Sequence, residues 1–128
     1  MWQTAQLRAR SEFSLYIRGD DESSDRLQNA LAMLQIPVVV GRPNSLWVPF
    51  PLAIPWARIL VIVPQEAFDK GPATAVLAAI DAVPPAERVR RRRLIHAHLT
   101  DLLWFANDSR MASNFLREAA AVRSNGRC

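Results

Sequence analysis

The residues of this chain best suited to chemistry follow an apolar run at 13–17 and precede another at 37–40. They are the polar and charged residues of a turn and of the helix start expected after it, namely Arg18, Gly19, Asp20, Ser23, Ser24 and Arg26. An arginine fork binds phosphate oxygens in pairs, and unpaired backbone N–H groups at a helix start attract an anion. A glycine in such a turn lets the backbone approach the ligand closely. This combination predicts a site for a phosphate-bearing ligand.

The elements that must position these residues form a strand, a loop, a helix and a second strand within residues 11–40. We expect Ser24 to cap the helix, because its hydroxyl can accept from backbone N–H groups two or three residues on. The apolar positions of the helix recur with the helical period and are Leu27, Ala30, Leu31 and Leu34. About 30 residues suffice for one parallel crossover. In such a unit the loop lies at the carboxyl edge of the sheet, where open α/β folds bind ligands.

The rest of the chain adds one strand and several helices. A third buried strand is expected at 59–63, after a proline-rich irregular crossing at 42–58, and residues 65–71 are expected to form a loop. Helices are expected at 1–10, 72–82, 85–105 and, capped by Ser109, 109–122. Strands that alternate with helices predict an α/β fold, a Rossmann-like parallel-sheet layered domain, over residues 1–128 as a single domain.

Composition narrows the classes of function. The chain has 128 residues, half of them hydrophobic, which suits one folded domain. Its single cysteine, Cys128, cannot form an internal disulfide, and no apolar run is long enough to span a bilayer. The sequence has no Walker loop, no zinc-ligand spacing and no Ser-His-Asp or Cys-His order. We therefore expect no bound metal.

A run of arginines concentrates the positive charge. Arg88 and Arg90–Arg93 are five of the sixteen basic residues in a chain of net charge +4. Such a run could bind nucleic-acid phosphates without sequence preference, so a small basic nucleic-acid-binding domain is one alternative. No aromatic residue is interleaved with the run, and we favour a solvated helix whose arginine stems cover Val89 and Leu94. We therefore expect no nucleic-acid partner.

Other polar and aromatic residues have structural interpretations beside the functional ones. Arg18 and Arg26 could pair with the acidic residues of 20–25 instead of a ligand. His96 and His98 lie on the arginine-rich helix without an obvious carboxylate partner, which indicates solvated or packing roles. The tryptophans Trp47, Trp56 and Trp104 are interpreted as packing aromatics, with sugar stacking as the alternative for Trp47 and Trp56.

Several short motifs follow one another in order between residues 10 and 64. They are Arg10-Ser11-x-Phe13-x-Leu15, Arg18-Gly19-Asp20, Ser23-Ser24-x-Arg26-Leu27, Ala30, Ile36-Pro37-Val38-Val39, Val48-Pro49-Phe50, Ile54-x-Trp56 and Val61-x-Val63-Pro64. Their order and spacing resemble the donor-binding half of exostosin-like glycosyltransferases. The arginine-rich segment suits the C-terminal end of that family.

The resemblance implies a GT-B enzyme, in which two Rossmann-like lobes face each other and the C-terminal lobe binds a nucleotide sugar, usually a UDP-sugar. Transfer to a glycan or glycoprotein acceptor would be inverting, with neither a metal nor another cofactor. The donor-binding residues it implies are Arg18, Gly19, Asp20, Ser23, Ser24, Arg26 and Asn29. The chain would be a fragment that lacks the N-terminal acceptor lobe. Relatives of this kind usually lie at the Golgi membrane, on its lumenal side.

The chain departs from the family pattern at two places. Asn29 stands where the family commonly has an acidic residue that can accept from ribose hydroxyls; the amide oxygen of Asn29 can also accept. Leu34-Gln35 stands where the family tends to have Gly-Cys, which implies a changed helix termination or a lost close approach. Asn29-Ala30-Leu31 and 36–41 also resemble the GDP-sugar lobe of α1,3-fucosyltransferases, which is the second glycosyltransferase interpretation.

Overall fold

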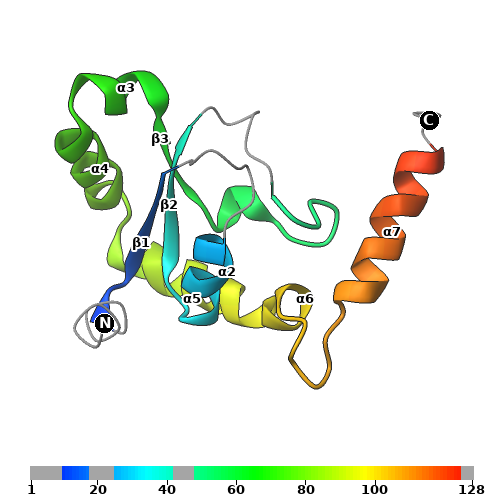
Figure 1. Cartoon of the computed structure of the whole chain (residues 1–128). Helices are drawn as coiled ribbons and strands as arrows, with labels where there is room; N and C mark the ends of the chain where they lie inside the picture. The colour runs from blue at the N-terminus through cyan, green and yellow to red at the C-terminus, as the bar shows by residue number, and fades with distance from the viewer. Residues whose placement is uncertain (1–9, 18–24, 42–47, 125–128) are drawn as a thin grey trace.

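A three-stranded parallel sheet forms the centre of the protein. The structure is a computed structural model that describes residues 10–17, 25–41 and 48–124. The sheet has the order β1-β2-β3 and consists of β1 (Phe13–Ile17), β2 (Ile36–Gly41) and β3 (Val61–Pro64) (Figure 1). In register, Ile17 lies opposite Val40, and Gly41 lies opposite Pro64. The mixed α/β class with a small parallel sheet is therefore confirmed, and it is compatible with a Rossmann-like fold.

The central strand β2 is the most deeply buried element. Its residues from Ile36 to Val40 are all buried, as expected for a parallel strand covered on both faces. Pro37 is tolerated because β2 pairs with β3 only from Val38 onward, while the N–H of Ile36 donates to Glu12 O over 2.8 Å. The missing donor of Pro37 thus falls outside the ladder with β3.

Helix α2 (Asp25–Ala32) joins the first two strands and covers one face of the sheet. Its buried positions are Leu27, Ala30 and Leu31, which confirms the predicted apolar face. Leu34 follows the helix with φ of 56°, and the N–H groups of Leu34 and Gln35 donate to Leu31 O and Ala30 O, each over 2.9 Å. This is a left-handed helix end with two capping bonds. The expected change of termination at Leu34 is therefore wrong, because leucine adopts the conformation that glycine would favour.

The crossing between β2 and β3 ends in a short 3-10 helix, η2 (Trp56–Arg58). The N–H groups of Ile59 and Leu60 both donate to Trp56 O, so these two residues close η2 and β3 starts only at Val61. The predicted strand thus began two residues too early. Trp56 is buried, and its indole N–H donates to Pro49 O over 2.7 Å. Trp56 is a core residue, as the packing interpretation held.

Two helices follow β3 and pack beside it. They are α3 (Gln65–Lys70) and α4 (Pro72–Asp81), and α4 confirms the helix predicted at 72–82. The loop predicted at 65–71 is wrong. Six residues form a helical turn and a half there, and the side chain of Gln65 donates to Asp69 Oδ1 over 2.8 Å along one helix face.

The C-terminal third is helical but does not form the long helix predicted at 85–105. Instead α5 (Pro85–Ala97) ends at His98, whose φ of −105° and ψ of 7° leave the helical region, and α6 (Leu99–Leu102) follows. The last helix, α7 (Met111–Ser124), starts two residues after Ser109, and the N–H of Met111 donates weakly to Ser109 Oγ at 3.4 Å.

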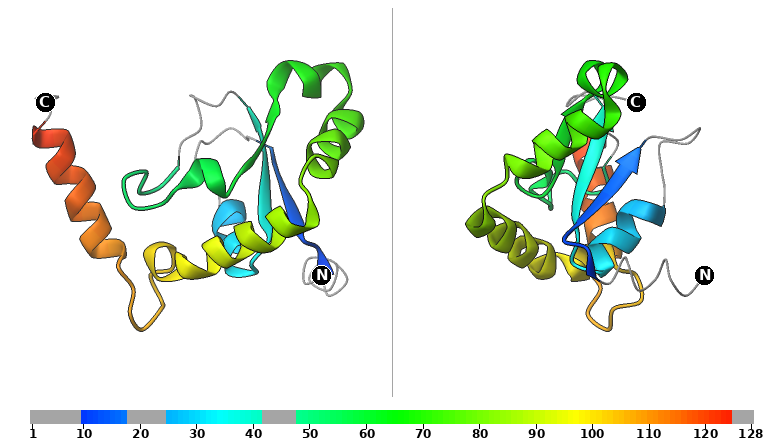
Figure 2. Two further views of the ribbon diagram at one scale, coloured as in Figure 1. Left: turned by 180° about the vertical axis from the view of Figure 1, so that it is seen from behind. Right: turned by 90° about the vertical axis from the view of Figure 1, so that its left-hand side faces the viewer.

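These helices differ in how closely they approach the sheet. Helices α4 and α5 lie on the side opposite α2 (Figure 2). Helix α7 extends away from the sheet and packs against α6. The sheet and its two helical layers therefore form the core, and α7 is an arm attached to it.

Candidate functional site

The predicted phosphate loop leaves the carboxyl edge of the sheet. Because the strands are parallel and in register, Ile17, Gly41 and Pro64 mark the same edge. Residues 18–24 connect this end of β1 to the start of α2. Of the predicted donor-binding residues, five lie outside the described residues: Arg18, Gly19, Asp20, Ser23 and Ser24. The cap expected from Ser24 lies outside them as well.

The other two predicted residues, Arg26 and Asn29, are brought together by α2. They are three positions apart, so they share one helix face, and both line a shallow hollow between α2 and β1. The residues that line this hollow are Ser14, Leu15, Arg26, Asn29, Ala30, Met33 and Gln35. Arg26 lies in the first turn of α2, which is the end nearest the carboxyl edge of the sheet. We call this surface the α2–β1 hollow.

The chemistry of the α2–β1 hollow is mixed. A guanidinium group, a carboxamide and the hydroxyl of Ser14 offer donors and acceptors, while Leu15 and Met33 expose 45% and 41% of their surface beside them. The volume is about 40 Å³, which is room for a few water molecules. It can therefore hold a small polar part of a ligand, such as a pair of hydroxyl groups, while the rest of the ligand lies on the surface.

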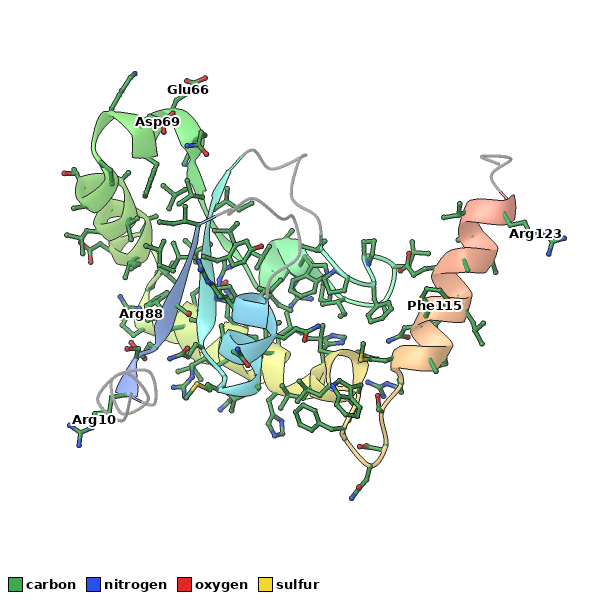
Figure 3. The ribbon with its side chains drawn as sticks, viewed as in Figure 1. Arg10, Glu66, Asp69, Arg88, Phe115 and Arg123 are labelled. Carbon is green, nitrogen blue, oxygen red and sulfur yellow. The ribbon has the colours of Figure 1, made fainter. Side chains whose placement is uncertain are left out.

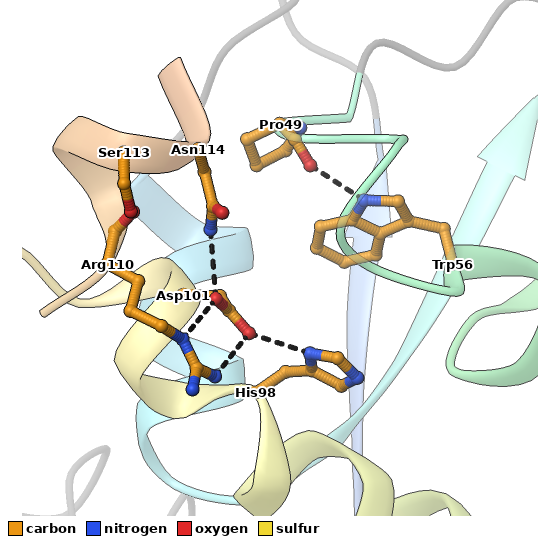
Figure 4. Close-up of polar contacts among 7 residues, drawn as sticks. All are labelled: Pro49, Trp56, His98, Asp101, Arg110, Ser113 and Asn114. Atoms are coloured by element: carbon orange, nitrogen blue, oxygen red, sulfur yellow. Dashed lines mark hydrogen bonds and ion pairs between the residues drawn. The ribbon is translucent and has the colours of Figure 1, made fainter. Parts of the chain in front are cut away.

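A second polar cluster was missed by the sequence analysis and lies where α6 meets α7 (Figure 4). At its centre is the buried carboxylate of Asp101. Arg110 donates to it twice, Nε to Oδ1 and a terminal nitrogen to Oδ2, each over 2.8 Å. The buried amide of Asn114 donates to Oδ1 over 2.9 Å, and His98 Nδ1 lies 2.8 Å from Oδ2. We call these four residues the Asp101 cluster.

The charges of the Asp101 cluster reinforce one another. The hydrogen bonds from Arg110 hold the pKa of Asp101 well below its usual range; burial opposes this shift, and the bonds from Asn114 and His98 support it. The hydrogen bonds between Arg110 and Asp101, together with the negative charge of Asp101, raise the pKa of Arg110. Asp101 therefore stays ionised at neutral pH and ties the loop before α7 to α6.

The prediction that His98 has no carboxylate partner is thus wrong, since Asp101 is that partner. His98 immediately precedes α6 and Asp101 lies three positions later, in the first turn of that helix; this spacing was the signal available in the sequence. A histidine oriented through Nδ1 by a carboxylate leaves Nε2 for another partner, an arrangement that many enzymes use. Here the carboxylate is held mainly by Arg110 and Asn114, so we assign the cluster to attachment of α7. His96 is exposed, in line with a solvated role.

The arginine run on α5 is bound largely within the protein. Arg88 (labelled in Figure 3) donates to Val83 O and Glu12, and its guanidinium lies 5.1 Å from the ring centroid of Phe13. Arg91 donates to Leu60 O over 2.6 Å and to Glu87, and Arg92 donates to Leu34 O over 3.1 Å. Arg90 pairs with Glu87. Several of these guanidinium groups thus connect α5 to the sheet and its loops, a role beyond the solvated face that we expected.

The exposed aromatics are found elsewhere. Trp104 exposes 75% of its surface and meets Phe105 edge-on, with ring centroids 5.9 Å apart, in the loop that follows α6. Trp47 lies outside the described residues. Among residues 10–17, 25–41 and 48–124, three or more His, Cys, Asp or Glu side chains nowhere form a group that could hold a metal ion. In the same residues, no helix is long and apolar enough to cross a membrane.

Comparison of the chain with protein-family models, with curated proteins and with solved structures found no match. The class that the fold and the hollow define is an α/β protein with a parallel sheet and a polar hollow beside its first crossover.

Proposed function

We propose that this chain is the donor-binding lobe of a glycosyltransferase of exostosin type, which binds a nucleotide sugar, most simply a UDP-sugar. The observation that carries the proposal is the α2–β1 hollow, where Arg26 and Asn29 of the family-like motif come together at the first parallel crossover. The sequence alone predicts both residues as donor-binding.

The end of α2 gives a second line of support. The family tends to have glycine where this chain has Leu34, and Leu34 adopts a left-handed conformation with φ of 56°. Glycine is the residue that this conformation favours. The backbone here thus has the shape that the family's glycine suits, although the side chain differs.

The proposed chemistry relies on fixed positive groups instead of a metal ion. Charge that develops on a departing diphosphate can be stabilised by the N-terminus of α2 and by Arg26. Asn29 would accept from, or donate to, the ribose hydroxyls. The sugar would pass to an acceptor hydroxyl that attacks the anomeric carbon from the opposite face, while a general base removes the hydroxyl proton.

In a GT-B enzyme the acceptor binds to a second lobe or in the cleft between the lobes, and the general base is expected there as well. We therefore propose that the isolated chain binds the donor and transfers nothing. In a complete protein, the family resemblance would place this lobe on the lumenal side of the Golgi membrane, acting on a glycan or glycoprotein. Detectable sugar transfer by the isolated chain would contradict the assignment as one lobe of two.

The test is a calorimetric titration of the chain with UDP and, separately, with GDP. We expect UDP to bind and GDP not to bind. Arg26→Ala should weaken UDP binding by roughly ten- to a hundredfold, as loss of a charged hydrogen bond does. Arg117→Ala is the matched control, because Arg117 is an exposed arginine on α7 and takes no part in the hollow.

Each outcome of the titration decides between interpretations. Binding of GDP in preference to UDP would favour the fucosyltransferase-like alternative. A folded chain that binds neither nucleotide, or equal effects of Arg26→Ala and Arg117→Ala, would refute the assignment of the α2–β1 hollow.

A further inference from the structure

The α2–β1 hollow changes in chemistry along its length. At the end nearest the carboxyl edge of the sheet it is lined by Arg26, in the first turn of α2. Asn29 follows about one turn further along the helix. The far end is lined by Met33, which comes directly after α2 and exposes 41% of its surface. The hollow thus passes from a cation through a carboxamide to an apolar thioether.

The floor of the hollow is built from buried groups. Ala30 and Gln35 are both buried, and Gln35 Nε2 donates to Ser11 O over 3.2 Å. The N–H of Met33 donates to Asn29 O over 3.2 Å, and that of Gln35 donates to Ala30 O over 2.9 Å. These backbone bonds fix the position of Met33 at the far end, while its side chain remains exposed.

The open edge of β1 forms the other wall. Within the described residues β1 is an edge strand that pairs with β2 alone. The N–H of Ile36 donates to Glu12 O over 2.8 Å. In a parallel ladder, this register turns the backbone groups of Ser14 and Tyr16 toward β2 as well. The N–H and C=O of Leu15, which lines the hollow, therefore point to the open edge and offer a donor beside an acceptor.

We propose that the hollow holds a nucleoside diphosphate lengthwise, with the diphosphate at Arg26, the ribose at Asn29, and the base against Met33 and the edge of β1. A nucleoside diphosphate has the same order of groups: an anion, a ribose with hydroxyls, and a flat ring. From Arg26 to Met33 the helix axis rises about 10 Å, which is comparable with the length of the extended ligand. This inference rests on the proposed function, to which it adds the orientation of the donor and the contacts of its base.

The two ends of the hollow would contact the ligand in different ways. The thioether of Met33 can pack against a ring and adapt to its shape. The backbone N–H and C=O of Leu15 can pair with a base edge that carries an acceptor beside a donor, as O4 and N3–H of uracil do. Only the ribose hydroxyls need to enter the hollow, which suits its small volume. The reverse orientation would place the diphosphate against Met33 and the base beside the guanidinium of Arg26, so charge selects the direction.

The test uses the whole chain labelled with carbon-13 at its methionine methyl groups. The chain has three methionines, Met1, Met33 and Met111. UDP should shift the signal of Met33, because the ring current of a base acts on groups that contact it. Inorganic pyrophosphate, which has no ring, should leave that signal in place. Met111 is the internal control, since it lies on α7 and takes no part in the hollow.

Calorimetry with variants separates the two ends of the hollow. Met33→Ala should raise the dissociation constant for UDP by roughly two- to tenfold, the range expected for one sulfur–ring contact, and leave that for pyrophosphate unchanged. Arg26→Ala should weaken the binding of both ligands. Leu77→Ala is the matched control, because Leu77 is an exposed apolar residue on α4 outside the hollow and its loss should affect neither ligand.

The outcomes distinguish this inference from the proposed function. If UDP binds but leaves the Met33 signal in place, or shifts Met33 and Met111 equally, the orientation is overturned while the assignment as a donor-binding lobe stands. The orientation is also overturned if pyrophosphate shifts Met33 as UDP does, or if Met33→Ala and Leu77→Ala have equal effects. A folded chain that binds no nucleotide overturns both proposals.

Discussion

Removal of the Asp101 carboxylate should detach or destabilise the C-terminal arm. In Asp101→Ala, the guanidinium of Arg110 loses two bonds of 2.8 Å, and the buried amide of Asn114 loses one of 2.9 Å. Breaking a fully buried ion pair costs about 3–5 kcal/mol. Arg110 exposes 55% of its side chain, so water can replace much of the hydrogen bonding that its guanidinium loses. Asn114 is only 2% exposed, so its unsatisfied amide costs about 1–3 kcal/mol. We expect a total loss of about 2–4 kcal/mol, within the range of these two estimates.

Two measurements separate local from global effects of this substitution. Urea unfolding reports the free energy of unfolding of the whole domain, and hydrogen exchange reports the opening of α7 by itself. If α7 opens locally, exchange of its amides should rise while the urea midpoint changes less. Asp108→Asn is the control, because Asp108 is an exposed carboxylate in the same loop and should change stability by no more than about 0.5 kcal/mol.

The reasoning about the Asp101 cluster fails if Asp101→Ala behaves like Asp108→Asn in both measurements. That result would mean that α7 is held by contacts other than the cluster. Faster exchange in β2 with no change in α7 would also contradict it, since β2 lies in the core and not in the arm.

Two further predictions concern acid stability and the end of α2. Because the pKa of Asp101 is lowered in the folded state, its ionisation stabilises the fold at pH values above the pKa of an unfolded aspartate, about 3.9, and this stabilisation is lost as pH falls through the folded pKa. The urea midpoints of the wild type and of Asp101→Ala should therefore converge as pH falls below about 4. A difference that stays constant with pH would contradict this linkage. Leu34→Gly should be more stable than Leu34→Ala by about 1 kcal/mol, because both lose the same packing but only alanine keeps a Cβ at φ of 56°. Inside α2, by contrast, Gln28→Gly should be less stable than Gln28→Ala by about 0.5–1 kcal/mol. Thermal unfolding that ranks Leu34→Ala above Leu34→Gly would refute the strain argument.

The elements that could be predicted were those with a clear apolar pattern in the sequence. The run at 13–17 and the β-branched run at 38–40 predicted β1 and β2 to within about two residues. Burial explains β2, whose residues 36–40 are all buried, whereas β1 is not the buried strand that its apolar residues suggest and exposes Leu15 and Ile17. The period of Leu27, Ala30 and Leu31 identified the buried face of α2 for the same reason. These signals are local, and the tertiary structure agrees with them.

The errors arose where distant contacts decide the backbone. The sequence at 85–105 has no glycine or proline after Pro85 to stop a helix, yet the chain leaves the helix at His98. There, Asp101 is held by Arg110, and the N–H of Arg110 donates to Thr100 O over 2.7 Å. No sequence window that ends at 105 contains both partners. Prediction of the candidate site was limited for another reason. Helical spacing indicates that Arg26 and Asn29 lie together, but it cannot show that Ser14 of β1 lines the same hollow.

The arginines of α5 show how one pattern can serve two purposes. Arg88, Arg91 and Arg92 donate to the carbonyl groups of Val83, Leu60 and Leu34, and each of these carbonyls lies where the chain leaves a helix or is about to enter a strand. Carbonyl groups at such points lack partners within a regular element and need another donor. A guanidinium group can bind a carbonyl and a carboxylate at once, as Arg88 and Arg91 do, because its donors point in several directions. A lysine at the same position has one point charge at the end of a flexible stem and would bridge the two groups less well. The need to satisfy carbonyls beside the sheet therefore explains most of a run that, by composition alone, is typical of a nucleic-acid-binding surface.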